Sequence, residues 1–250
     1  MLLVEEQSRS EIEALTEPFN YLEYLRCVAT DTTRPKRDRT KYQLHLAILS
    51  LADQENLEDI LIDDVVKKAV VARGTFYQYY PNTMALLTDA IRDFFATTWQ
   101  HRPADRLFRD ALSYIYVTRL YSARTFGATP KLFFWYWYLS RRNPELVAER
   151  AEMAGRSSQF MLSLLDAKIA LRDDERALNA MLRSAALMWN EMQVSYFIEE
   201  DPILTRSIRT ETELTELSVK AWFRLVYGED ITRTNPVISV DLSKVTLEKT

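Results

Sequence analysis

Hydrophobic and polar residues follow helical spacing along most of the chain. Apolar positions recur three or four residues apart within segments that proline, glycine or polar breakers separate, which is the pattern of amphipathic helices. The expected helices span about residues 40–55, 60–69, 72–78, a longer stretch from 83, 104–124, 130–141, 144–171, 174–199 and 206–227. Gly228 is placed to end the last helix as a C-cap.

The apolar faces of two helices identify candidate core residues. Helix 40–55 is expected to bury Leu44, Ala47, Ile48 and Leu51. The helix from 83 follows the breaker Pro81-Asn82-Thr83, and its buried side is expected to hold Leu86, Leu87, Ala90, Ile91, Phe94 and Phe95.

The two ends of the chain show weaker patterns. Residues 1–33 form an acidic extension, in which Ser10 and Glu13 fit a helix capping box and Pro18 is expected to kink the helix. This extension either docks on the body or a partner, or serves only solubility. From 229 onward, strand-like alternation lacks a partner hairpin, so the tail is expected to be extended or disordered.

Composition narrows the fold class. The 250 residues include only four glycines, whereas sheet-rich folds need many glycine turns, so an all-α fold is expected. The single cysteine rules out an intramolecular disulfide. With only two histidines beside it, a metal site of thiolate or imidazole ligands is unexpected, so we expect no metal and no cofactor. With no signal-peptide core and no apolar run near the roughly 18 residues of a membrane span, a cytoplasmic protein without membrane contact is predicted.

The charge distribution says more than the total charge. A net charge of −4 and a pI near 5.4 argue against nucleic-acid binding. Binding depends on the local field, however, and two basic clusters stand out. The first cluster is Arg34, Lys36, Arg37, Arg39 and Lys41, and the second is Lys67, Lys68 and Arg73. The alternative is that both are ordinary solvated surface.

Residues 62–80 carry the most informative pattern. They predict two short helices joined by a tight turn, and the second helix opens with small, hydroxyl and cationic groups and closes with aromatic ones. A helix-turn-helix needs this arrangement, because one helix braces across the phosphates while the N-terminal end of the next enters the major groove. The pattern therefore predicts binding to double-stranded DNA.

The stretch from about Leu44 to Leu87 resembles the TetR family of bacterial transcriptional regulators. The likeness rests on Val65, Ala69, Val71, Arg73-Gly74-Thr75-Phe76-Tyr77, Tyr80, Pro81 and Leu86-Leu87. Beyond residue 90 it rests only on length and helix pattern. The resemblance implies a homodimer whose C-terminal domain encloses a small-molecule effector, with a repressor as the usual role.

Four positions depart from the family pattern. Val70 replaces the usual turn glycine, and because a β-branched residue resists positive φ, another turn geometry is expected. Thr83 replaces a phosphate-gripping lysine, and Ala72 replaces the serine that begins the recognition helix. Asn56 replaces a glycine, which is a mild change. Together these departures weaken phosphate contacts more than base readout.

Residues of the helix-turn-helix are expected either to contact DNA or to pack in the core. Arg73 is expected to read guanine, with a surface salt bridge to Asp63 or Asp64 as the alternative. Phe76 and Tyr80 are expected in the core. The full set of candidates is Arg34, Lys36, Arg37, Arg39, Lys41, Lys67, Lys68, Arg73, Gly74, Thr75, Tyr77, Gln78, Tyr79 and Thr83.

The aromatic run at 132–138 points to a cavity or an interface, because aromatics on every face of a short helix cannot all serve one core. The candidate effector-lining residues are Phe95, Trp99, Tyr114, Tyr121, Trp135, Trp189, Met192 and Tyr196, and ordinary core packing is the alternative for each. Since fixed charges are scarce among them, an apolar or aromatic effector is expected.

The expected dimer face lies on 177–198 and 208–227. Its apolar positions are Leu178, Met181, Leu182, Ala185, Leu217, Val219, Trp222, Phe223 and Val226. Two recognition helices about 34–36 Å apart would then read both halves of a palindrome.

The expected organisation is an all-α chain with an extension at 1–33, a three-helix helix-turn-helix domain at 34–82, a ligand-binding and dimerisation domain at 83–228, and a tail at 229–250. An adaptor that has lost sequence-specific DNA binding is the alternative function. An enzyme is not expected, because no nucleophile motif accompanies His45 or His101, and Asp173-Asp174-Glu175 is typical of a helix start.

Overall fold

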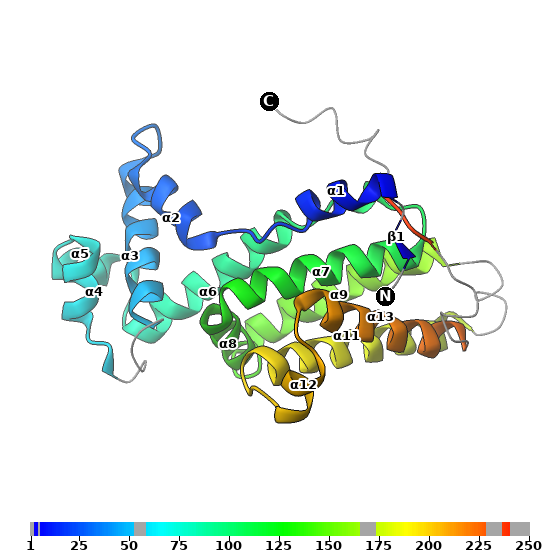
Figure 1. Ribbon diagram of the computed structural model, residues 1–250. Helices are drawn as coiled ribbons and strands as arrows, with labels where there is room; N and C mark the ends of the chain where they lie inside the picture. Colours follow the sequence, from blue (N-terminus) through cyan, green and yellow to red (C-terminus); the bar gives the residue numbers. More distant parts are fainter. Residues whose placement is uncertain (1–2, 5, 53–58, 166–173, 229–236, 241–250) are drawn as a thin grey trace. The chain divides into compact units, whose positions relative to one another are not determined.

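The computed structural model describes residues 3–4, 6–52, 59–165, 174–228 and 237–240 (Figure 1). Apart from one pair of two-residue strands, the regular elements of these residues are helices, so the all-α fold class is confirmed. Contacts group the chain into two compact units. The head unit is Phe19–His101 with Thr129–Leu146, and the body unit is Met1–Pro18, Arg102–Ala128 and Val147–Thr250. The domain boundaries at 33, 82 and 228 stay a prediction.

The head unit is built around one central helix. It contains α2 (Tyr21–Thr30), α3 (Lys36–Ala52), α4 (Ile62–Ala69), α5 (Arg73–Tyr79), α6 (Thr83–Gln100) and α8 (Pro130–Leu139). Helices α2, α4 and α6 all pack on α3 (Figure 1). The predicted inward positions of α3 (Leu44, Ala47, Ile48 and Leu51) are buried, as are those of α6 except the half-buried Phe95.

Two expectations about the N-terminal part are corrected. Helix α3 begins at Lys36 rather than near 40, so the basic residues from Lys36 to Lys41 lie on its first turns instead of ahead of it. Helix α1 (Glu6–Leu15) begins before Ser10, so Ser10 lies inside the helix and is not its cap. Asparagines begin other helices, because Asn20 accepts a hydrogen bond from the N–H of Glu23 and Asn82 one from that of Ala85.

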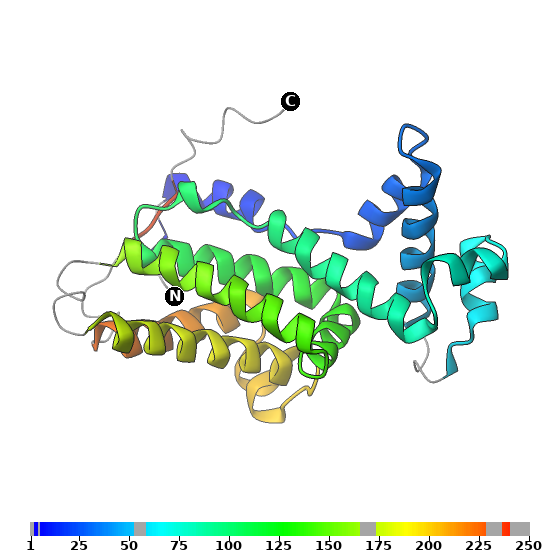
Figure 2. The same cartoon turned by 180° about the vertical axis from the view of Figure 1, so that it is seen from behind.

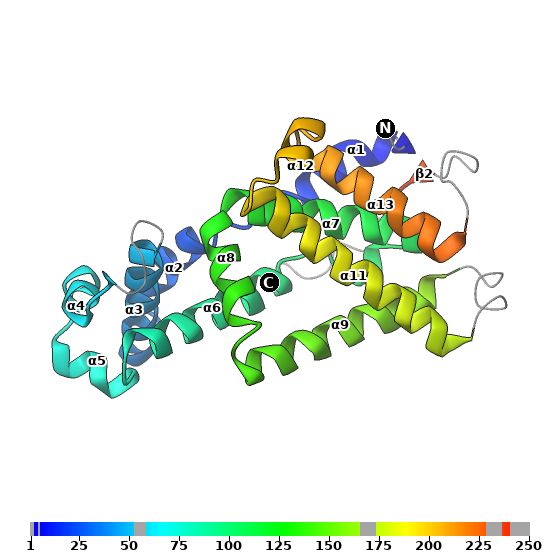
Figure 3. The ribbon, with the colours of Figure 1, turned by 90° about the horizontal axis from the view of Figure 1, so that it is seen from below.

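The body unit contains α1, a 3₁₀ turn at Asp105–Leu107, α7 (Ala111–Ala128), most of α9 (Pro144–Leu164), α11 (Glu175–Phe197), α12 (Pro202–Ser207) and α13 (Glu211–Tyr227). Helices α7, α11 and α13 lie side by side (Figure 3). Asp174 caps α11 by accepting the N–H of Ala177, and Gly228 ends α13 in the left-handed conformation with φ 71°, which confirms both sequence expectations.

The residues assigned to a dimer face need correction. Seven of the nine lie in the core of the single chain, where α11 and α13 pack against each other and against α7; they are Leu178, Leu182, Ala185, Val219, Trp222, Phe223 and Val226. Only Leu217 among the nine is exposed, and Met181 is half-buried. The sequence pattern marked these helices as amphipathic but did not show which partner their apolar faces meet.

The two ends of the described chain meet. Val237–Ile238 (β2) pairs in parallel with Leu3–Val4 (β1) (Figure 2). The side chain of Ile238 is buried. The strand-like alternation in the tail therefore has a partner, although not a hairpin partner, because the partner strand lies at the opposite end of the sequence. The predicted tail on either side of 237–240 lies outside the described residues, as does Asn56. No helix in the described ranges is long and apolar enough to cross a membrane.

Candidate DNA-binding interface

Helices α4 and α5 form a helix-turn-helix in which α4 packs on both α3 and α5. Val65, Ala69 and Phe76 are buried, and Tyr80, which follows α5, is also buried. The carboxylate of Asp64 accepts the N–H of Leu61 and so closes the first turn of α4. These contacts hold the opposite face of α5 outward. Phe76 and Tyr80 thus take the core positions that the sequence predicts.

The turn between the two helices takes a strained geometry. Val70 has φ 55° and ψ 45°, in the left-handed region, so the expectation of another turn geometry is wrong. The backbone explains why: the N–H of Val70 is bonded to the carbonyl of Lys67, and that of Val71 to the carbonyl of Val66, which together end α4 in the manner of a glycine cap. The Val70 side chain is 90% exposed, so it recovers no energy from burial.

The start of the recognition helix lacks a side-chain cap. Ala72 occupies the N-cap position with no hydrogen bond from its side chain, as its sequence predicts. Gly74 follows in open space, because a Cβ atom added there would meet nothing within 4 Å. Packing within the chain therefore does not require a glycine at this position.

Arg73 projects outward from the first turn of α5. Its Nη1 lies 2.6 Å from Oδ1 of Asp63, and both side chains are more than half exposed. The guanidinium carbon also lies 6.0 Å from the ring centre of Tyr77. Hydrogen bonding to Tyr77 and the charge of Asp63 raise the pKa of Arg73. An exposed ion pair of this kind contributes little stability, so a phosphate or a guanine edge can replace Asp63.

The fourteen candidate DNA contacts all lie in the head unit, and none is fully buried. The exposed ones are Lys36, Arg37, Lys67, Lys68, Arg73, Gly74, Tyr77 and Gln78. The half-buried ones are Arg34, Arg39, Lys41, Thr75, Tyr79 and Thr83. Contact of any of them with DNA stays a prediction.

Besides Arg73 and Tyr77, three of these candidates have partners within the chain. Arg34 pairs with Asp31 at 3.3 Å, and Lys41 with Asp89 at 2.9 Å. The hydroxyl of Tyr79 donates to the carbonyl of Arg37 at 3.0 Å, and this bond fixes the end of α5 against the first turn of α3. Tyr79 is therefore a link that positions the recognition helix.

A partly buried polar cluster lies behind the interface. One carboxylate oxygen of Asp89, on α6, lies 2.6 Å from the Tyr80 hydroxyl, 3.0 Å from Nε2 of His45 and 2.9 Å from the Lys41 ammonium. Burial by itself raises the pKa of Asp89, but the hydrogen bonds from His45, Tyr80 and Lys41 outweigh it and hold the pKa well below its usual range. The cluster joins α3, the end of α5 and α6 through one charged group.

The N-terminal extension contributes a second polar link. Tyr21, fully buried on α2, donates a hydrogen bond of 2.6 Å to Asp93 on α6. Burial and the neighbouring Asp93 raise the pKa of Tyr21, so it stays protonated as a donor. Residues 19–30 are thus part of the head unit rather than a solubilising segment.

The candidate effector-lining residues are divided between the two units. In the head unit, Phe95 stacks on Tyr136 with ring centres 3.9 Å apart and lies beside Trp99, while Trp135 donates a hydrogen bond to the carbonyl of Ala52 at 3.4 Å.

In the body unit, Tyr114 packs against Phe108 and Phe160, and Tyr121 is buried. Trp189 forms a separate apolar cluster there with Met192 and Tyr196. A common pocket for all eight residues stays a prediction.

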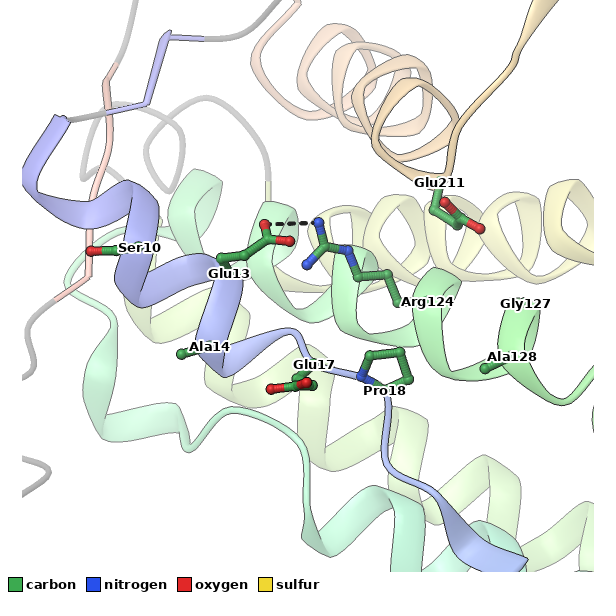
Figure 4. Close-up of a pocket in the computed structure, with 9 residues that line it drawn as sticks. All are labelled: Ser10, Glu13, Ala14, Glu17, Pro18, Arg124, Gly127, Ala128 and Glu211. Atoms are coloured by element: carbon green, nitrogen blue, oxygen red, sulfur yellow. Dashed lines mark hydrogen bonds and ion pairs between the residues drawn. The ribbon is translucent and has the colours of Figure 1, made fainter.

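An open groove in the body unit has a different character (Figure 4). It lies between α1, the end of α7 and the start of α13, and its charged lining is Glu13, Glu17, Glu211 and Arg124. Arg124 is held by Glu13 at 2.9 Å and by the hydroxyl of Thr16 at 2.7 Å. None of the predicted effector-lining residues is part of this groove. In the described part of the chain, no group of three or more metal-ligating side chains occurs.

Sequence reasoning missed the groups that position the interface. From the sequence alone, His45 is considered only in connection with catalysis, and Asp89 and Tyr21 are given no role. Their polar atoms meet only in the folded head unit, because α2, α3 and α6 contribute them. These residues lie too far apart in the sequence to form a recognisable motif. The helical phase of Asp89 and Asp93, one turn apart on the side of α6 that faces α2 and α3, is the only available indication.

This arrangement is that of a helical protein with a helix-turn-helix, in which a short second helix is presented on the supporting helices α2, α3 and α6. The comparisons agree. No family model matches the chain. The chain is 25% identical over 218 residues to the HTH-type transcriptional regulator EthR of Mycobacterium tuberculosis, covering 80% of this chain and 92% of that protein, and the same figures hold for EthR of Mycobacterium bovis.

A solved structure shows the same fold. It is described as a TetR-family transcriptional regulator from Syntrophomonas wolfei, with a TM-score of 0.55 and 13% identity, and the match covers 77% of this chain and 97% of that one. The chain thus shares its fold with a TetR-family transcriptional regulator and is similar in sequence to an HTH-type transcriptional regulator. Its relatives are regulators rather than enzymes.

Proposed function

We propose that the protein is a cytoplasmic homodimeric repressor that leaves a palindromic operator when a small apolar or aromatic effector binds. The observation that carries this proposal is the outward face of α5, where Arg73, Tyr77 and Gln78 are exposed while Phe76 is fully buried. Similarity to EthR along most of that protein's length supports the same kind of role.

Each outward group has a chemical task in this proposal. Arg73 leaves Asp63 and donates two parallel hydrogen bonds to O6 and N7 of a guanine, while Gln78 reads an adenine. Lys36, Lys67 and Lys68 are exposed cations and contact phosphates, which set affinity and salt dependence but not sequence preference.

Dimerisation is assigned to the outer faces of α11 and α13. Leu187, Leu217 and Leu225 are 44%, 45% and 41% exposed, which is unusual for leucine on helices whose opposite faces form the core. A second copy of the chain would cover these side chains and place two recognition helices in successive major grooves.

Titration of the protein's own promoter DNA tests the proposal. Fluorescence polarisation should show specific binding that weakens steeply with salt. Arg73→Ala should cost about 1–3 kcal/mol per half-site, the usual value of a bidentate base contact. Arg156→Ala is a matched control, because Arg156 also sits in an exposed ion pair, with Glu152, but on α9.

The opposite result would support the alternative function. Ala72 provides no cap and Val70 is strained, and both features favour an adaptor with weakened DNA binding. If promoter DNA is retained no better than random DNA, and Arg73→Ala behaves like Arg156→Ala, the repressor proposal is wrong and the adaptor stands.

A further inference from the structure

The core of the body unit contains a cation with no counter-charge. Arg119 of α7 is only 4% exposed, and among the described residues it forms no ion pair. Its guanidinium bonds Ser218 of α13 through both the carbonyl and the hydroxyl, and it bonds the carbonyl of Ala185 on α11 at 3.3 Å. A buried charge held only by neutral acceptors is costly, and desolvation lowers the pKa of Arg119 to about 9.

Arg119 has more N–H groups than its contacts with Ser218 and Ala185 use. A guanidinium carries five N–H donors, and the contacts with Ser218 and Ala185 account for three bonds. The face of the guanidinium lies 5.5 Å from the ring centre of Trp189, which shields it from water on that side. Two of the five N–H groups therefore lie outside the contacts with Ser218 and Ala185.

Three buried polar groups on the neighbouring helices have no hydrogen-bond partner among the described residues. These groups are Nε2 of Gln193, the hydroxyl of Thr215 and Nε1 of Trp222. The acceptor of Gln193, its Oε1, is already satisfied by the Ser122 hydroxyl at 2.9 Å. Native cores rarely leave several polar groups unmet, and here the unmet capacity consists of donors.

Helical spacing places these donors along one seam. Ala185, Trp189 and Gln193 follow one another at intervals of four residues on α11, and on α13 Ser218 lies three residues after Thr215 and four before Trp222. Side chains at such intervals share one face of a helix. Helices α7, α11 and α13 pack against one another, so these faces meet between them. We name the set Arg119, Ser122, Gln193, Thr215, Trp222 and Trp189 the donor seam.

We propose that the donor seam binds the carboxylate group of a small ligand whose remaining atoms are apolar. A carboxylate has about four lone-pair sites and accepts the paired N–H groups of an arginine, so it supplies both the acceptors and the charge that the seam lacks. Met192, Tyr196, Ile208 and Leu214 form an apolar cluster with Trp189, which is the environment for the ligand's hydrocarbon part.

This inference rests on the proposed function and makes it more specific, because it gives the apolar effector an acidic end. The seam lies inside the helical core, so the ligand must part α7, α11 and α13 to reach it. A ligand that binds only the opened arrangement shifts the population toward that arrangement, which is what release from an operator requires.

Matched pairs of probes test the proposal on the full-length protein. Decanoate and decan-1-ol differ little except in charge, and 4-phenylbutyrate and 4-phenylbutan-1-ol form a second such pair. Dissociation constants are measured by calorimetry at pH 7.5, below micelle formation. Since a charge-assisted pair contributes more than a neutral hydrogen bond, each carboxylate should bind roughly 10- to 100-fold more tightly than its alcohol.

Variants of the seam should remove that preference. Arg119→Gln keeps a donor but loses the charge, so the carboxylate should bind no more tightly than the alcohol, while alcohol binding stays within about threefold of the parent. Gln193→Leu provides a second variant in case Arg119→Gln fails to fold by circular dichroism, and it should reduce the preference severalfold. Arg156→Gln, in the exposed pair on α9, should leave it unchanged.

The results separate the site from the proposed function. If neither carboxylate is preferred over its alcohol, if no probe binds, or if the preference survives in both folded seam variants, the donor seam is not a carboxylate site and ordered water satisfies it. Promoter DNA is titrated in parallel. Specific DNA binding without a carboxylate preference overturns only the seam, whereas a carboxylate preference without DNA binding overturns only the repressor.

Discussion

Replacing Val70 with glycine should stabilise the protein. Val70 is one of two non-glycine residues in the described chain with positive φ, at 55°. The left-handed conformation costs an L-residue roughly 1–2 kcal/mol, and a β-branched side chain lies at the upper end of that range. Because the side chain is 90% exposed, its removal sacrifices almost no buried apolar area.

The expected gain is smaller than the relieved strain. Glycine is more flexible than valine in the unfolded chain, and this difference returns about 0.5–1 kcal/mol to the unfolded state. The net stabilisation should therefore be about 1 kcal/mol. In a chain of this size, a change of that magnitude raises the melting temperature by about 2–4 °C.

Urea unfolding followed by circular dichroism measures the difference. Val70→Ala keeps an L-residue but removes the branch, so it should gain less than Val70→Gly. Glu200→Gly is the matched control, because Glu200 has φ 50° at an exposed position in the body unit and should gain a similar or smaller amount. A loss of stability in Val70→Gly, or a gain no larger than that of Val70→Ala, would refute the strain argument.

Three further perturbations follow from other contacts. Asp89→Asn should cost about 2–4 kcal/mol in urea unfolding, because an amide cannot serve three donors; a loss below about 0.5 kcal/mol would contradict the cluster. The depressed pKa of Asp89 means that its stabilisation is present above its unfolded pKa of about 3.9 and disappears as pH falls toward the folded value, so Asp89→Asn should flatten the acid limb of the stability curve. Tyr21→Phe removes the donor to Asp93 and should lower the free energy of unfolding by about 1 kcal/mol, measured by urea unfolding. An unchanged free energy would contradict this hydrogen bond. Leu217→Glu should shift the mass measured by light scattering from that of a dimer to that of a monomer. Val147→Glu, at a similarly exposed valine of α9, should not. If the two variants behave alike, the assignment of the dimer face is wrong.

Sequence patterns were sufficient for most of the helices because their determinants are local. Proline, glycine and asparagine mark the ends, and apolar spacing marks the inner faces. Helix α9 illustrates the boundary error that remains, since it ends at Leu164 and the rest of the expected span, to 171, extends into residues outside the described ranges. Ser10 illustrates a second error, because its capping pattern was outweighed by a helix that had already begun at Glu6.

The turn at Val70 shows how tertiary structure overrides a local preference. The intrinsic preference of valine argues against a left-handed turn, but α4 packs on α3 and the apolar side chains Val65, Ala69 and Phe76 of α4 and α5 are all buried. That requirement fixes the turn, and the chain tolerates the strain at one residue. The identity of the residue therefore did not determine the geometry.

The buried groups of the body unit could not be found from sequence for a different reason. Arg119 occupies a helix in which cations usually face solvent, and its burial depends on where α11 and α13 lie. Seven residues expected on the dimer face were misplaced for the same reason, since the apolar faces of α11 and α13 that carry them meet within one subunit. Periodicity shows that a face is apolar but not what covers it.

Because Leu3–Val4 pairs in parallel with Val237–Ile238, a change near one end of the chain affects the structure at the other. An expression clone trimmed ahead of Val237 would lose the fully buried Ile238 and leave Leu3–Val4 without a neighbour, and a fusion joined directly before Leu3 would disturb the same contact from the other side. Affinity tags on this protein therefore need a spacer at whichever end they are attached.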